Sequence, residues 1–321
     1  WQVIAELEKQ YDVRPVNLDV PIADDVSVLI VPQPSSLKDP QIIVLHDYIW
    51  SGRSTLILED PMPMFAGPQL ASSQPRPPSQ QQMMMGQQTP PEPKPDLKPL
   101  LNALGLEMPL NHILWSDFNP SHQFRNVWPR NLVWSFRALD GIGEAPFLRG
   151  INSLLFPWPG EVKRAPNASE DLIVSSLASP VNQNVWGNHT YDEFISQSMF
   201  GTQMRTPERY IPRSGDRPSV AVKVTGKMRR AYGPDQSAED DQNQDKSQNK
   251  SQDEKPKAVK LTKGAISAQS INVIFVADID FAHDEFFAFY RNSDGQFSDD
   301  ALQFLAELRN VQFISNMVDA L

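Results

Sequence analysis

The sequence predicts an α/β protein built on an open, mostly parallel sheet of the flavodoxin-like or amidotransferase-like kind. An attached β-rich region and two disordered insertions complete the prediction. Short, continuous apolar runs such as residues 26–31 and 271–277 are typical of strands that are buried on both faces of a parallel sheet. Helical apolar stripes accompany these runs near both ends of the chain, which is the pattern of an α/β sheet. A length of 321 residues is enough for a sizeable core and about two folding units.

Residues 1–65 are expected to form the first part of the α/β domain. The opening segment, residues 1–11, has a helical stripe with its charged residues turned away; the stripe consists of Trp1, Ile4, Leu7 and Tyr11. The apolar run 26–31 then predicts the first buried strand. This segment therefore predicts a helix that docks on a sheet.

A second helix and a second strand follow within the same part. Asp39 and Pro40 predict an N-cap followed by proline at the first helical position, and Gly52 predicts the end of that helix. Residues 54–58 form another short apolar run, which predicts a buried strand. The order of elements is that of an open α/β sheet.

Two segments have a composition that is typical of disorder. Residues 66–99 hold nine prolines, seven glutamines and a run of three methionines, and residues 234–257 contain no valine, isoleucine, leucine or aromatic residue. Such compositions bury too little apolar surface to offset the entropy of ordering. We therefore expect a Pro/Gln/Met-rich flexible insertion at 66–99 and an acidic disordered insertion at 234–257.

The remaining parts are a β-rich region and the end of the α/β domain. Residues 100–233 contain many aromatic residues among prolines and asparagines, which favours short strands and loops, with further strands at 172–177 and 219–224. Residues 258–321 return to the α/β pattern. They hold the apolar run 271–277, a helix capped by Ser298 and a final helical stripe from Val311.

Composition excludes several functional classes. The formal net charge of −10 argues against nucleic acid as a partner, because phosphate binding depends on clustered lysine and arginine. The chain has no cysteine, so disulfides, thiolate zinc sites and cysteine nucleophiles are absent. Neither a P-loop motif nor a G-x-S-x-G motif occurs, and the five histidines show no H-x-x-x-H pair. We therefore predict no catalytic residue and no cofactor.

Four acidic residues follow two of the predicted strands. Glu59 and Asp60 end the strand at 54–58, while Asp278 and Asp280 end the strand at 271–277. Because open α/β sheets bind ligands beyond the carboxyl ends of their strands, these carboxylates are candidate ligands for Mg²⁺ or Ca²⁺ if the two strands are neighbours. The alternative is that they cap helices and stabilise turns, as acidic residues commonly do.

Three tryptophans of the β-rich region are candidate ligand-binding residues. Trp115, Trp128 and Trp134 supply large rings on which a sugar or a peptide stacks. The alternative is that these rings pack a small second core beneath loops.

Short sequence blocks occur in a characteristic order along nearly the whole chain, at residues 6–13, 26–32, 49–52, 56–61, 219–227, 273–281 and 310–321. In this order they resemble the large extracytoplasmic domain of gliding-motility-type auxiliary components of ABC transporters, a family of uncharacterised ABC-type transport systems. Ala277 stands where that family often has glycine. The two insertions have no counterpart in the family pattern.

The resemblance implies a non-enzymatic interaction domain of a membrane-anchored auxiliary subunit. Its partners would be the permease and ATPase subunits of the same ABC system, and its place would be the periplasmic side of the inner membrane. Contact with the membrane would come through segments outside this fragment, since no apolar run approaches the ~20 residues of a spanning helix. The family has no catalytic residues to transfer. Two other functions stay open, namely a metal-dependent hydrolase that uses the four acids and a carbohydrate- or peptide-binding module that uses the tryptophans.

Overall fold

The computed structural model describes residues 1–76, 92–121, 130–181, 185–198, 201–213, 215–233, 263–291 and 308–321. The acidic stretch 234–257 and the helix expected after Ser298 lie almost wholly outside these residues. Trp128 is outside them too.

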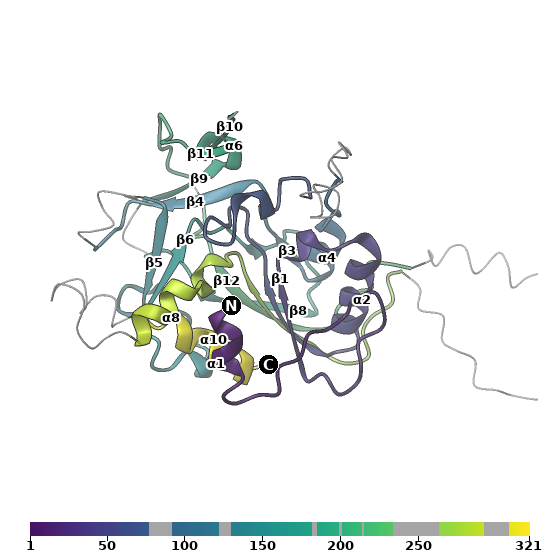
Figure 1. Cartoon of the computed structure of the whole chain (residues 1–321). Helices are drawn as coiled ribbons and strands as arrows, with labels where there is room; N and C mark the ends of the chain where they lie inside the picture. The colour runs from purple at the N-terminus through teal and green to yellow at the C-terminus, as the bar shows by residue number, and fades with distance from the viewer. Residues whose placement is uncertain are drawn as a thin grey trace, which may run out of the picture.

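A five-stranded sheet forms the centre of the described structure (Figure 1). Its order in space is β1 (Val28–Pro32), β2 (Ser54–Leu58), β13 (Ile271–Val276), β12 (Ala221–Gly226) and β8 (Leu172–Ala178). All five strands were predicted from the sequence within two residues at each end. The sheet joins strands from both ends of the chain, because β13 pairs with β2.

The sheet is mixed, and the prediction of a mostly parallel sheet needs correction. β1, β2 and β13 pair in parallel, whereas β12 pairs antiparallel with both β13 and β8. An apolar run has the same periodicity in either direction, so the sequence did not reveal that β12 is reversed. A mixed α/β architecture is confirmed, while the flavodoxin-like detail stays a prediction.

Helices cover both faces of this sheet. Figure 1 shows α1 (Gln2–Leu7), α8 (Asp284–Arg291) and α10 (Asn310–Asp319) on one side, and α2 (Asp39–Trp50) and α4 (Lys98–Ala103) on the other. The two sides correspond to two buried clusters, one containing Leu56 and Val276 with α10, the other containing Ile57 and Phe275 with α2. Burial on both faces explains why the sequences of β2 and β13 are nearly continuous apolar runs, whereas Ile173 of the edge strand β8 is exposed.

The helix α2 begins one position earlier than the capping pattern predicted. Its N-cap is Lys38, whose backbone N–H donates to Gln41 Oε1 at 2.9 Å, and Asp39 is already the first helical residue. An acidic residue in the first turn still interacts favourably with the helix dipole. The predicted end is confirmed, because α2 stops at Trp50 and Gly52 adopts a φ of +89°.

The region 100–233 is rich in short antiparallel strand pairs, as its composition predicted. The pairs are β3 (Leu106–Glu107) with β7 (Lys163–Arg164), β4 (His112–Ser116) with β9 (Trp186–Thr190), β5 (Leu132–Phe136) with β6 (Ser153–Pro157), and β10 (Ile195–Ser198) with β11 (Gly201–Met204). A one-turn helix, α6 (Tyr191–Phe194), follows β9, and short 3-10 turns lie at Pro34–Ser36, Pro68–Leu70, Arg137–Leu139, Pro146–Leu148 and Asp280–Ala282.

Both described ends of the expected insertion 66–99 belong to the folded body. Ala71 and Leu97 are buried, and the Arg76 backbone N–H donates to Glu92 O at 2.9 Å. The stretch between Arg76 and Glu92 lies outside the described residues. The folded part of this segment is therefore longer than its composition indicated.

The end of β12 depends on a glycine. Gly226 has a φ of +113°, and a Cβ on it would collide with the backbone oxygen of Asp171. Gly226 pairs with Leu172 on one side and with Ile271 on the other. This residue therefore holds β12 close to both neighbouring strands.

We expect Gly226→Ala to lower the free energy of unfolding by roughly 2 kcal/mol more than Gly215→Ala, because overpacking is added to the strain of a positive φ. Gly215 has a similar φ of +110°, and a Cβ on it would meet no atom within 4 Å, so it isolates the backbone effect. Urea denaturation of both variants measures the difference. Equal destabilisation would show that the contact with Asp171 contributes nothing.

Candidate functional site

The carboxyl edge of the parallel strands is the candidate site. β2 and β13 are hydrogen-bonded neighbours, so Glu59 and Asp60 at the end of one strand lie beside Asp278 and Asp280 at the end of the other. All four side chains are buried, with at most 1% of any residue exposed. The sequence left open whether the two strands are neighbours, and the structure shows that they are. We call them the acidic edge.

Glu59 is held by hydroxyl and backbone donors. Its Oε2 accepts from the backbone N–H of Ser35 at 2.9 Å, and its Oε1 accepts from Ser72 Oγ at 2.5 Å. Burial raises the pKa of Glu59, while these donors and the Lys94 ammonium act to lower it. Glu59 therefore connects the segment after β1 with the segment after β2.

Asp60 and Asp280 bind the backbone that follows β2. Asp60 Oδ1 accepts from the N–H of Met62 at 2.7 Å, and its Oδ2 accepts from the N–H of Ile279 at 2.9 Å. The Asp280 carboxylate accepts from the N–H groups of Phe65 and Ala66 at 3.1–3.2 Å. These contacts hold residues 61–72 against the carboxyl edge of the sheet. We call this stretch the strap.

Gln33 fixes the strap from the end of β1. It adopts a left-handed φ of 50°, and its Nε2 donates to the carbonyl oxygens of Asp60 and Leu70 at 2.8 and 2.9 Å. Its Oε1 accepts from the Asp60 N–H at 3.1 Å. One buried amide side chain therefore satisfies three backbone groups of the segment from Asp60 to Leu70.

Lys94, in the segment that begins at residue 92, also contacts this site. Its Nζ donates to Leu70 O at 2.6 Å and to Ala71 O at 2.7 Å, and it lies 3.4 Å from Ser35 Oγ. Burial lowers the pKa of Lys94 to about 8, although Glu59 acts to raise it. Lys94 therefore supplies the cation nearest to Glu59 and ties residues 92–97 to the strap.

Asp278 differs from the other three acids. Its Oδ1 accepts from the N–H of Phe281 at 2.9 Å, but its buried Oδ2 has no hydrogen-bond partner in the described part of the chain. Burial, followed by the charges of Asp60 and Asp280, raises the pKa of Asp278 well above its ordinary value. Burial likewise raises the pKa of Asp60, and it raises that of Asp280 to about 7.

The four carboxyl groups of the acidic edge are better placed to accept hydrogen bonds from the chain than to bind a cation. Within the described ranges, no set of three or more histidine, aspartate or glutamate side chains has a geometry that would hold a metal ion. Seven of the eight carboxylate oxygens of the acidic edge accept hydrogen bonds from the chain itself. A metal at Glu59, Asp60, Asp278 and Asp280 stays a prediction that these contacts do not favour.

The tryptophans proposed as a stacking platform occupy different surroundings. Trp115 on β4 and Trp134 on β5 are each 1% exposed, and Trp134 packs in a cluster with Leu132 and Leu155. Trp128 lies outside the described residues. A ligand site formed by these three residues stays a prediction, and neither described ring is accessible for stacking in this structure.

The family models place the chain among transport proteins. The model described as an ABC-type uncharacterized transport system matches residues 1–317. The chain belongs to this auxiliary family of ABC transport systems. In the described residues of this ABC auxiliary protein, no helix has the length and apolar character needed to cross a bilayer.

Other comparisons add little to the family assignment. Among curated proteins, no sequence matches this ABC auxiliary chain. A solved structure titled mmIFT52 N-terminal domain is similar to it at 8% sequence identity and a TM-score of 0.42, over 98% of this chain and 89% of that one.

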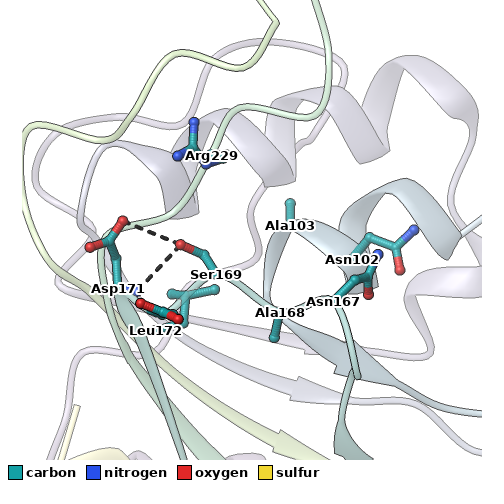
Figure 2. Close-up of a pocket in the computed structure, with 9 residues that line it drawn as sticks. Asn102, Ala103, Asn167, Ala168, Ser169, Asp171, Leu172 and Arg229 are labelled. Carbon is teal, nitrogen blue, oxygen red and sulfur yellow. Dashed lines mark hydrogen bonds between the residues drawn. The ribbon is translucent and has the colours of Figure 1, made fainter.

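A separate pocket lies at the opposite edge of the sheet. It has a volume of about 490 Å³ and lies at the start of β8, where Leu172 pairs with Gly226 (Figure 2). Its lining is mostly polar and includes Asn102, Asn167 and Arg229. Figure 2 shows Ser169 hydrogen-bonded to Asp171 at its margin. Sequence reasoning did not identify this pocket, because its residues come from three distant segments.

Sequence reasoning also missed three residues that contact the acidic edge or the strap. Gln33, Ser72 and Lys94 each contact Glu59 or the strap, yet none lies in a recognisable motif. Lys94 is the only lysine between Pro90 and Asp96, within a proline-rich stretch, so its composition pointed to disorder. The signal available in the sequence was one lysine, Lys94, in a chain with four acids at the ends of two predicted strands.

We expect Asp278→Asn and Asp280→Asn to change stability in opposite directions at pH 8. The first change keeps the acceptor for Phe281 and removes a buried charge whose second oxygen has no donor, which raises the free energy of unfolding by about 1 kcal/mol. An amide at position 280 would turn an N–H group toward the N–H groups of the strap, which lowers the free energy of unfolding by roughly 1–3 kcal/mol. Urea denaturation tests both, and shifts of the same sign would contradict the assigned contacts.

Stability is also expected to rise as the pH falls from 7 to 5. The pKa of Asp280 is about 7 in the folded protein against an ordinary 3.8, so below pH 7 the folded state holds a proton that the unfolded state releases. Carboxyls with lowered pKa, such as Asp47 and Glu193, lose their contribution only below about pH 4.5. Denaturation midpoints at four pH values measure the slope. Asp278→Asn should flatten it, and a wild-type midpoint that falls with acidification would refute the mechanism.

Proposed function

We propose that the chain is a non-enzymatic, extracytoplasmic interaction domain of a membrane-anchored auxiliary subunit in an ABC transport system of the gliding-motility type. The observation that carries this proposal is the family match over residues 1–317. Its partners would be the permease and the ATPase of the same system. It would lie on the periplasmic side of the inner membrane, attached through segments outside this chain.

The closed acidic edge supports a role in interaction over one in catalysis. In open α/β sheets, ligands bind outside the carboxyl ends of the strands. Here the strap fills that position, and Glu59, Asp60 and Asp280 are all occupied by donors of the chain. A substrate would have to displace residues 61–72 to reach these carboxyl groups.

The sequence supports a division of labour among subunits. The chain carries no P-loop motif, so nucleotide hydrolysis would be the task of a separate ATPase subunit. Its acidic composition fits a protein partner better than a nucleic acid. In the described part of the chain, the contacts of the acidic edge do not favour metal-dependent hydrolysis, and the burial of Trp115 and Trp134 does not favour a stacked sugar, so we do not propose either.

The predicted compartment can be tested because the chain has no cysteine of its own. We expect a full-length protein with Asp24→Cys to react in intact cells with a maleimide that does not cross membranes, since the side chain of Asp24 is fully exposed. Thr55→Cys provides the control, because Thr55 is 0% exposed and should react only after denaturation. Labelling is read by mass shift on a gel.

Reaction of Asp24→Cys only after cell lysis would place the domain in the cytoplasm and contradict the proposed compartment. Purification of the tagged full-length protein in mild detergent then tests the partners. Recovery of the permease and ATPase subunits of the same system is the expected result. Their absence, with the protein itself folded and membrane-bound, would contradict the proposed role.

A further inference from the structure

The strand pair β4–β9 carries a group of aromatic rings that lies outside the acidic edge. Trp115 lies opposite Gly187, and His189 lies opposite Ile113, so the indole and the imidazole share one face of the pair. Their ring centroids are 6.2 Å apart. Phe194 and Tyr210 meet His189 edge-on, with centroids at 5.3 and 4.9 Å. We call Trp115, His189, Phe194 and Tyr210 the aromatic box.

Gly187 determines where the indole lies. A Cβ on this residue would be 2.5 Å from both Nε1 and Cε2 of Trp115. The N–H edge of the indole therefore rests directly on the backbone of β9, two residues before His189. No larger residue at position 187 is compatible with this placement.

The tautomer of His189 follows from its neighbour Glu193. Nδ1 of His189 lies 3.2 Å from Glu193 Oε2, and the same oxygen accepts from the N–H of Thr190 at 2.7 Å. The hydrogen bond from Thr190 is the main cause that lowers the pKa of Glu193, so the carboxylate is ionised at neutral pH. An ionised carboxylate requires a donor, so in the tautomer that fits this contact Nδ1 holds the proton and Nε2 presents a lone pair.

Two buried polar atoms in the box have no partner. His189 is 3% exposed and Trp115 is 1% exposed, and neither His189 Nε2 nor Trp115 Nε1 has a hydrogen bond to any described residue. One atom is an acceptor and the other is a donor. Buried polar groups in folded proteins nearly always have a partner, which is often an ordered water or a ligand.

We propose that the aromatic box binds one hydroxyl group, which accepts a hydrogen bond from Trp115 Nε1–H and donates its own proton to His189 Nε2. The hydroxyl belongs to an ordered water or to a small polyol. Aromatic walls with a few placed polar atoms are the usual lining of small-molecule sites. Next to the box, the Arg130 guanidinium lies 4.7 Å from the Tyr210 ring centroid and pairs with Asp117 at the surface. This inference does not depend on the proposed transport role.

Magnetic resonance on the whole chain, with the tryptophan indoles labelled with ¹⁵N, tests the proposal. Trp115→Phe assigns the Trp115 indole signal by its loss. If magnetisation is transferred from a long-lived water to this indole proton, and added glycerol does not change the transfer, the hydroxyl is that of a water. A saturable shift of the same signal on addition of glycerol or glucose identifies it as a polyol. Absence of both would overturn the proposal.

Two substitutions separate the box from general effects on folding. His189→Phe keeps a ring but removes the acceptor, so the water transfer or the polyol response should be lost. His112→Phe makes the same change on the opposite face of the strand pair and should leave both intact. A response that survives His189→Phe would overturn the proposal. If that variant fails to fold, the ring ¹⁵N shifts of His189 in the wild type still report whether Nε2 accepts a hydrogen bond.

Discussion

Burial of four carboxyl groups at one edge of the sheet is the constraint on which the rest of the site depends. A carboxylate removed from water is tolerated only when it receives hydrogen bonds. Glu59, Asp60 and Asp280 receive theirs from the backbone and hydroxyl groups of residues 35, 62, 65, 66, 72 and 279. The chain that leaves β2 must therefore turn back across the sheet as the strap. The carbonyl groups of the strap need donors in turn, and Gln33 and Lys94 supply them.

The same constraint bears on function. A parallel sheet normally leaves its carboxyl edge open to ligands, and catalytic groups gather there. In this ABC auxiliary protein the acids at that edge serve the fold, and Phe65 of the strap packs edge-on against Trp158 at 5.8 Å, which closes the edge further. Among the described residues, buried polar atoms without a hydrogen-bond partner include Asp278 Oδ2 at this edge, and Trp115 Nε1 and His189 Nε2 in the aromatic box of β4–β9.

The sequence predicted the local features of this structure well. An apolar run predicted the limits of β2, and Gly52 predicted the end of α2. Both predictions agree with the structure to within a few residues. The sequence placed Glu59 and Asp60 after one strand and Asp278 and Asp280 after another, but it did not reveal that these strands are neighbours, because strand order depends on pairing between distant segments. The reversal of β12 and the role of Lys94 could not be predicted, since both depend on contacts between segments more than twenty residues apart.

Asp278 shows how the acidic edge alters the charge of the whole protein. The formal net charge of −10 counts every carboxyl as ionised. Asp60, Asp278 and Asp280 lie together with pKa values raised by burial, and no described cation reaches Asp278 Oδ2. Three adjacent buried charges repel one another strongly at low dielectric, so the group retains a proton at neutral pH. The folded protein is therefore less acidic than its sequence, and that difference is released as a proton when the edge is opened.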